Sequence, residues 1–378
     1  MTGTFEFSIT GTDEFARCGM MRTPHGEVAT PAFMPVGTRA AVKAMSPDEL
    51  WAMGYRLVLA NAYHLLVRPG PELVREMGGV ARFMAFPGAT LTDSGGFQAM
   101  SLAGINSISE DGIRFRSHLD GAPVMLTPEG AIEVQQALGS DIMMVLDECT
   151  PYPASHGDAL KSLEMTARWA ERCLRTHSSP TQALFGIVQG SVYPDLRRMS
   201  ARQITSMPFD GYAVGGLSVG EPKEAMLEMA ALGASMLPVD RPRYLMGVGT
   251  PSDLIAAIGM GFDMFDCVIP TRNARNGMAF TRRGRISIKR AAHQRETGPL
   301  DPECECRPCR TFSRAYLRHL FMSGEILAAR ALTEHNLSFY ARLMREAQAA
   351  IASRTFRAFA NSLTAALEEG EAANKETD

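Results

Sequence analysis

The sequence predicts an α/β protein built as a (β/α)8 TIM barrel with an inserted zinc-binding subdomain. Eight short apolar runs recur between residues 32 and 265, and each closes on glycine or a polar residue. Helical patterns lie between them, several with proline in the first turn beside acidic residues, as at Ser46-Pro47-Asp48-Glu49 and Thr250-Pro251-Ser252-Asp253. The chain of 378 residues, 46% of them hydrophobic, is long enough for such a barrel. A doubly wound open sheet is the rival architecture.

The chain divides into an N-terminal segment and a repeating region. Residues 5–31 alternate apolar and polar side chains around two turns, which predicts a small antiparallel lid over residues 1–31. The barrel repeats are expected over residues 32–295. The predicted strands are 32–36, 57–60, 90–92, 142–146, 183–188, 212–214, 244–246 and 264–265.

Two hairpin-like insertions interrupt the repeats. Residues 108–125 carry Asp111-Gly112 and Asp120-Gly121, and residues 279–289 fold about Arg283-Gly284. Asp-Gly pairs between alternating segments are typical of tight hairpin turns. We therefore expect both segments to leave the barrel as antiparallel strands.

Three cysteines within six residues indicate a metal site. Cys304, Cys306 and Cys309, with His335 further along, supply three thiolates and one imidazole, a closed tetrahedral zinc set. His319 is the competing fourth ligand. Four protein ligands leave no position for water, so we expect one structural Zn2+ per chain.

The chain after the barrel strands is expected to hold this site and one last helix. The zinc-binding insertion is placed at residues 296–336, and an amphipathic pattern predicts the final barrel helix over residues 337–367. Residues 368–378 are acidic and lack aromatic side chains, which predicts a disordered tail.

Polar residues follow five of the predicted strands. In a (β/α)8 barrel the carboxyl ends of the strands meet at one face, so these side chains should share a pocket. They are Asn61, Asp93, Asp147, Gln189 and Asp266. The alternative is that Asp and Asn are simply common where strands pass into loops.

The segment after the eighth strand combines a carboxylate with cationic side chains. Asp266 follows an apolar run and precedes Arg272 and Arg275, which are three residues apart. A carboxylate can hold a glycosyl group covalently, and arginine forks suit phosphate oxygens. This pattern favours chemistry on an anionic substrate over a solvated turn.

Composition limits the partners and the location. The net charge of −3 argues against a general nucleic-acid coat, so a polyanion should bind locally. No apolar run approaches the length that spans a membrane, and the N-terminus has no basic segment followed by an apolar one. We expect a cytoplasmic protein without membrane contact.

Four motifs together resemble the bacterial tRNA-guanine transglycosylases, also called queuine tRNA-ribosyltransferases. They are Asp93-Ser94-Gly95-Gly96-Phe97-Gln98, Gly215-Gly216-Leu217, Asp266-Cys267-Val268-Ile269-Pro270-Thr271-Arg272 and the cysteine cluster. The resemblance covers nearly the whole chain. It implies exchange of guanine at the wobble position of tRNAs with GUN anticodons, those for Asp, Asn, His and Tyr, for a 7-deazaguanine in queuosine biosynthesis.

The resemblance also implies roles for single residues. Asp266 is the expected nucleophile at the ribose C1′, and Asp93 the general acid/base for the two bases, an arrangement related to that of retaining glycosidases. Base binding is expected from Asp93, Ser94, Gly95, Gly96, Phe97, Asp147, Gln189, Gly216, Leu217 and Met246. Phe97 and Met246 would sandwich the base, although such an apolar pair is more often plain core.

The family's RNA-contacting loops match two further segments. A flipped-out nucleotide needs phosphate ligands at the pocket rim, such as backbone amides at a helix start and arginine forks. The implied RNA-binding residues are Gly247, Val248, Gly249, Thr250, Pro251, Ser252, Asp253, Thr271, Arg272, Asn273, Ala274 and Arg275. Cys149 and Val219 resemble bacterial positions that suit 7-aminomethyl-7-deazaguanine, and the bacterial relatives imply a homodimer.

Three other functions compete with this one. A non-catalytic RNA-binding subunit of the same fold should lack Asp93 or Asp266, and this chain has both. A zinc hydrolase needs histidine at strand ends, and no histidine closes any of the eight. A hydrolytic N-glycosidase would use the same acid pair, so only the fate of the intermediate separates it.

Overall fold

Eight parallel strands pair in a closed ring in the computed structural model, which describes residues 5–102 and 107–376. The strands follow chain order around the ring, and β14 returns to β4 with Phe265 opposite Phe33. The predicted barrel is confirmed, and the open sheet is excluded. The ring strands are β4 (Ala32–Gly37), β5 (Leu57–Ala60), β6 (Ala89–Thr92), β10 (Ile142–Met144), β11 (Ala183–Val188), β12 (Gly211–Val214), β13 (Arg243–Leu245) and β14 (Met264–Cys267).

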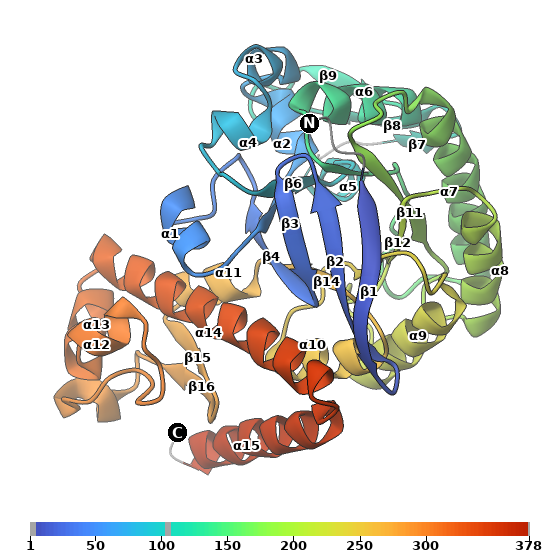
Figure 1. Ribbon diagram of the computed structural model, residues 1–378. Helices are drawn as coiled ribbons and strands as arrows, with labels where there is room; N and C mark the ends of the chain where they lie inside the picture. The colour runs from blue at the N-terminus through green and yellow to red at the C-terminus, as the bar shows by residue number, and fades with distance from the viewer. Residues whose placement is uncertain (1–4, 103–106, 377–378) are drawn as a thin grey trace.

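Helices surround the ring (Figure 1). Several begin as the sequence predicts, because Ser46 forms a capping box with Glu49, and Thr127 and Thr250 each accept a hydrogen bond from the first helical turn. The helices along the repeats are α1 (Pro47–Ala52), α2 (Ala62–Val67), α3 (Pro71–Glu76), α4 (Val80–Phe83), α5 (Gly96–Leu102), α6 (Pro128–Leu138), α7 (His156–Thr176), α8 (Pro194–Thr205), α9 (Lys223–Met236), α10 (Pro251–Gly259) and α11 (Ile269–Arg275).

The N-terminal segment is an antiparallel sheet of β1 (Glu6–Asp13), β2 (Ala16–Thr23) and β3 (Gly26–Thr30). Arg17 bonds Asp263, the residue before β14, and His25 bonds Asp141, the residue before β10. These contacts lie at the amino ends of the ring strands. The sheet therefore closes the bottom of the barrel and leaves the carboxyl ends open.

Both predicted insertions are antiparallel. β7 (Ser107–Ser109), β8 (Gly112–Arg116) and β9 (Pro123–Leu126) form one small sheet, and β15 (Met278–Thr281) pairs with β16 (Gly284–Ser287). Gly284 turns the second hairpin with a φ of 81°, a backbone conformation that glycine adopts without strain. That hairpin begins the metal-binding subdomain, which continues through η1 (Ala291–Arg295), α12 (Arg307–Thr311) and α13 (Arg314–Met322) and lies beside the barrel in Figure 1.

The C-terminal helices differ from the prediction. Instead of one helix over 337–367 there are two, α14 (Ile326–Ala352) and α15 (Phe356–Glu376). The break falls where Arg354 takes a left-handed conformation with a φ of 57°, and no glycine or proline marks it in the sequence. Because α14 begins at Ile326, His335 lies inside the helix that covers the barrel and not before it.

The predicted disordered tail is also wrong, since α15 continues to Glu376. Leu363 and Leu367 are buried, and Gly370 packs so closely on the Arg283 carbonyl that no side chain would fit. These contacts order a stretch whose composition is typical of solvated chain. Within the described ranges, no helix has the length and hydropathy to cross a membrane.

Candidate active site

A cavity of about 550 Å³ opens at the carboxyl ends of the ring strands. Most of the predicted base-binding and catalytic residues line it: Asp93, Ser94, Gly95, Phe97, Asp147, Gly216, Leu217, Met246 and Asp266. Gly96 lies just behind, against Asp147 and Leu146, and Gln189 is buried beside Asp147. The barrel thus brings together side chains that are far apart in the sequence.

Asp266, on the last turn of β14, is held by one carboxylate oxygen. Its Oδ1 accepts hydrogen bonds from the Tyr244 hydroxyl at 2.6 Å and the Gly247 amide at 2.8 Å. No described residue donates to Oδ2. Burial raises the pKa of Asp266, and the bonds from Tyr244 and Gly247 oppose that rise. The result is an oriented carboxylate with one oxygen unoccupied by the protein.

Asp93 follows β6 and sits in a different environment. Its Oδ1 accepts from the Ala62 amide at 2.9 Å, and its Oδ2 from Asn61 at 2.5 Å. Burial raises the pKa of Asp93 to about 7, and the nearby charge of Asp266 raises it further. A carboxyl group that titrates near neutrality can both give and take a proton.

Asp147 and Gln189 form a buried polar pair at the ends of β10 and β11. Gln189 Nε2 donates to Asp147 Oδ2 at 2.6 Å, and burial raises the pKa of Asp147 to about 6. Gln189 Oε1 is buried without a partner among the described residues. A buried amide oxygen left unpaired costs free energy, so this pair is prepared for a ligand that carries hydrogen-bond donors.

Arg197 is a site residue that the sequence analysis missed. It is fully buried on α8 and donates to the carbonyls of Gly215 at 2.7 Å, Gly216 at 3.1 Å and Ser191 at 2.8 Å. It therefore fixes the glycine pair beside the cavity. Arginine in a polar helical segment next to Arg198 is typical of a solvated face, so the sequence carries no signal for this role.

Phe97 and Met246 both line the cavity, as predicted. Phe97 exposes 50% of its surface, which is unusual for a phenylalanine with a purely structural role. Its position at the start of α5 presents an aromatic side chain to whatever enters.

The two segments predicted to contact RNA border the cavity and a larger groove. This groove, of about 1260 Å³, lies between α10, α11, β16 and α15, and it meets the cavity at Ile269 and Arg272. It is lined by Thr250, Ser252, Asp253, Arg272 and Asn273 from the predicted set. Four predicted side chains are instead buried and unavailable to a ligand: Val248, Pro251, Thr271 and Ala274. They pack the two loops.

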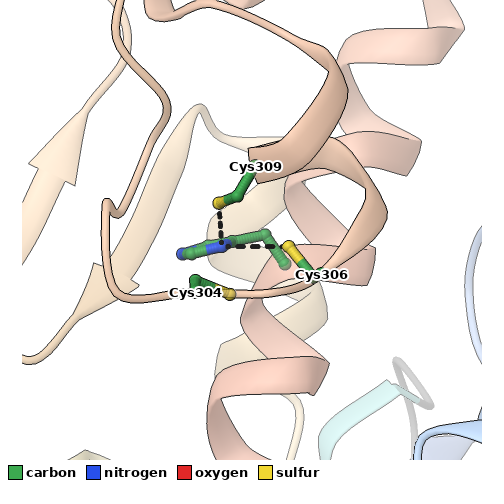
Figure 2. Close-up of side chains that lie close together, drawn as sticks. Cys304, Cys306 and Cys309 are labelled. Atoms are coloured by element: carbon green, nitrogen blue, oxygen red, sulfur yellow. Dashed lines mark hydrogen bonds between the residues drawn. The ribbon is translucent and has the colours of Figure 1, made fainter.

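Cys304, Cys306, Cys309 and His335 offer ligand atoms that lie within 4.8 Å of one another (Figure 2). His335 Nε2 donates to the Phe280 carbonyl at 2.8 Å, which leaves Nδ1 as the unprotonated nitrogen, 3.3 Å from Cys309 Sγ and 3.6 Å from Cys306 Sγ. Tetrahedral zinc with bonds of about 2.3 Å to sulfur and 2.0 Å to nitrogen separates such atoms by about 3.5 Å. The residues fit a metal ion, and His319 is outside the cluster.

The chain was compared with known proteins. A family model described as queuine tRNA-ribosyltransferase matches residues 12–369. A protein named queuine tRNA-ribosyltransferase from Symbiobacterium thermophilum is 52% identical over 362 residues, 96% of this chain and 90% of that protein. One of the same name from Sorangium cellulosum is 55% identical over 370 residues, 98% of this chain and 94% of that protein.

Proposed function

Because the chain belongs to the queuine tRNA-ribosyltransferase family, we propose that it exchanges guanine at the wobble position of GUN tRNAs for a 7-deazaguanine. The chain is an enzyme of the pentosyltransferase class. The observation that carries the proposal is the pairing of two carboxylates on one cavity: Asp266 with a free oxygen, and Asp93 with a pKa of about 7.

In the proposed first half-reaction, Asp266 Oδ2 attacks the ribose C1′ of the flipped-out nucleotide. The bond from C1′ to guanine N9 breaks, its electron pair goes to the base, and Asp93 supplies the proton that makes guanine neutral. The product is an ester between Asp266 and the ribose. The hydrogen bonds to Oδ1 orient the attack, because they hold the carboxylate by the oxygen that does not react.

In the second half-reaction the incoming base loses its N9 proton to the Asp93 carboxylate. N9 then attacks C1′, and Asp266 leaves as a carboxylate. Asp93 ends protonated, as it began, so no proton is gained or lost over the cycle. Two displacements at C1′ restore the original configuration at the ribose, as in retaining glycosidases.

Base recognition is proposed for Asp147, Gln189 and Gly216, with Phe97 and Met246 on the base faces. An ionised Asp147 accepts from the N–H groups of a guanine-like edge, and the amide of Gln189 serves the rest of that edge. For the substituent we propose an aminomethyl group. Glu221 accepts hydrogen bonds from the amides of Ser218 and Val219, which turns the Leu217 carbonyl the other way, as an acceptor for an ammonium.

The proposal extends to the partners and the metal. A structural Zn2+, one per chain, would be held by Cys304, Cys306, Cys309 and His335, and it would supply rigidity only, because a closed set leaves no open position. The substrates are tRNAs of the Asp, Asn, His and Tyr type, which places the enzyme in the cytoplasm. Homodimerisation is supported by exposed apolar side chains on α13 and α14: Tyr316, Met322, Ile326 and Leu327.

The test is a base-exchange assay with purified protein. Radiolabelled guanine should enter an unmodified tRNA whose anticodon starts with G and leave again when 7-aminomethyl-7-deazaguanine is added. The matched control is the same tRNA with A at the wobble position, which should take up no label. Guanine release with an accumulating abasic site would replace the proposal by a hydrolytic N-glycosidase, and tRNA binding without either reaction would replace it by a binding protein.

Guanine release should slow as pH rises above about 7. Asp93 must be protonated to protonate the departing base, and its folded-state pKa of about 7 sets the alkaline limb. Asp266 must be ionised, so its raised pKa sets an acid limb at lower pH. The measurement is the single-turnover rate of guanine release with excess enzyme between pH 5 and pH 9. A rate that still climbs at pH 8.5 would exclude Asp93 as the acid.

The Tyr244→Phe variant should lower kcat by roughly 10- to 100-fold, the usual worth of a hydrogen bond to a charged group, while KM for tRNA changes little. Loss of the hydroxyl also removes a contact that lowers the pKa of Asp266, so the acid limb should move to higher pH. Tyr212→Phe is the matched control, because that hydroxyl donates to the Met207 carbonyl at 2.8 Å and not to a site residue. An unchanged acid limb in Tyr244→Phe would contradict this role.

A further inference from the structure

One face of helix α14 connects the metal cluster to the catalytic end of the barrel. His335, a member of the cluster, and its neighbour Asn336 are both fully buried. The backbone of Phe280 on β15 is gripped by both: its carbonyl accepts from His335 Nε2 at 2.8 Å, and its amide donates to Asn336 Oδ1 at 2.9 Å. The position of Asn336 is therefore tied to that of the metal ligand beside it.

The amide group of Asn336 reaches a second element, helix α11. Its Nδ2 donates to the Pro270 carbonyl at 2.9 Å and to the Met278 carbonyl at 3.0 Å. Both amide hydrogens and the oxygen are thus in use. Asparagine is a poor residue for a helix interior, so its place inside the 27-residue α14 is explained by these bonds and not by helix propensity.

Helix α11 depends on such contacts. It has only seven residues, far too few to be stable alone, and it starts two residues after β14 ends with Asp266-Cys267. It carries Arg272, which lines both the cavity and the groove, and Arg275, which donates to the Thr271 carbonyl at 2.9 Å. Whatever fixes the first turn of α11 therefore fixes the direction of both guanidinium groups.

The same helix face also holds the second RNA-facing loop. Tyr340, one turn beyond Asn336, donates its hydroxyl to the Gly249 carbonyl. Tyr340 also packs edge-on against Phe280, with ring centroids 5.5 Å apart. The two loops at the rim are thus anchored from one side by residues within one and a half turns of the metal ligand.

We propose that Asn336 is a positioning residue for the reaction, through which α14 sets the arginine-bearing helix α11 in register with the metal cluster. This inference rests on the proposed function, because it assigns the two arginines to RNA. The metal cluster then has a task beyond stability: it fixes the geometry of the RNA-binding rim without touching RNA.

The first test compares two amide-to-carboxylate variants on the same helix. Asn336→Asp removes the donor and sets a negative charge against the Pro270 and Met278 carbonyls. Gln348→Glu is the matched control, since Gln348 also donates to backbone carbonyls, those of Pro31 and Ala29, but at the opposite end of the barrel. Asn336→Asp should raise KM for tRNA roughly tenfold, within the range seen for residues that couple sites, and leave KM for guanine and the metal content unchanged.

A double-mutant comparison separates positioning from general destabilisation. In an Arg272→Ala, Arg275→Ala background, Asn336→Asp should add no further loss of RNA affinity, because the groups it positions are gone. The salt dependence of RNA binding should fall by about 1.4 in log–log slope in either variant, about 0.7 for each lost phosphate contact on a single strand. Additive losses, or an unchanged slope in Asn336→Asp, would overturn the inference.

Hydrogen exchange on the wild-type chain tests the same link if the variants fail to fold. Removal of the metal with a chelator should speed amide exchange in residues 271–276, whereas α8 on the far side of the ring should stay protected. Protection of residues 271–276 that survives metal removal would overturn the inference. This arm needs no activity, so a chain that exchanges no guanine would refute the proposed function and leave the positioning claim to be judged separately.

Discussion

The Asp266→Asn variant should form no covalent complex with RNA and should lose base exchange by about 10⁴-fold or more, the scale of losses when a nucleophile is removed. Asparagine has the same shape and can still accept from Tyr244 and Gly247 at Oδ1. What changes is the free oxygen, which becomes an amide nitrogen without nucleophilic character. The measurement is denaturing gel electrophoresis of enzyme incubated with an anticodon stem-loop.

The same variant should be more stable than the wild type at neutral pH. The folded-state pKa of Asp266 is raised by burial, so ionisation is disfavoured in the folded protein. Such a group lowers stability as pH rises from its unfolded to its folded pKa, and the loss stays constant above that. The unfolding temperature of Asp266→Asn should therefore exceed that of the wild type at pH 8, and the difference should vanish near pH 4.

Asp210→Asn provides the matched control. Asp210 lies just before β12, at the opposite end of the ring, and accepts from the Leu184 amide at 2.9 Å. Its replacement should leave exchange intact. If Asp266→Asn still trapped RNA, the nucleophile would have to be sought elsewhere on the cavity, with Asp93 as the next carboxylate.

The barrel could be predicted because buried parallel strands appear as short apolar runs, and because a closed ring sends all their carboxyl ends to one face. That rule alone places Asp93, Asp147 and Asp266 in one cavity. The C-terminal bounds could not be predicted, because the break at Arg354 uses a left-handed residue with no glycine. The order of the last helix likewise depends on its packing against the β15–β16 hairpin, which composition does not reveal.

The partners of the site residues were beyond sequence reasoning for a related reason. Tyr244 has the composition of a core strand residue, and Arg197 that of a solvated helix face. Each acquires its role only when folding brings it against Asp266 or the Gly215-Gly216 backbone. Asn336 is similar, since nothing in its neighbourhood along the chain indicates a contact with Pro270. Spacing identifies groups that do chemistry and not those that hold them.

The Cys306→Ala variant should lose its metal and a large part of its thermal stability together. The subdomain core is small, with eight buried residues: Ala274, Ala279, Ile288, Leu300, Cys309, Leu317, Ala331 and Leu332. Cores of this size rarely suffice alone, and structural zinc in isolated fingers contributes about 10 kcal/mol or more. Elemental analysis and a thermal scan measure the two effects.

Cys18→Ala is the control for this prediction, because Cys18 is also a buried thiol but lies on β2, outside the cluster. It should keep one metal ion per chain. Ala274 belongs both to the subdomain core and to α11, so the loss of metal in Cys306→Ala should also weaken RNA binding more than guanine binding. Unchanged metal content in Cys306→Ala would show that the ligand set is wrong. Equal losses for RNA and guanine would mean instead that the cluster supports the whole barrel and not its RNA-facing rim.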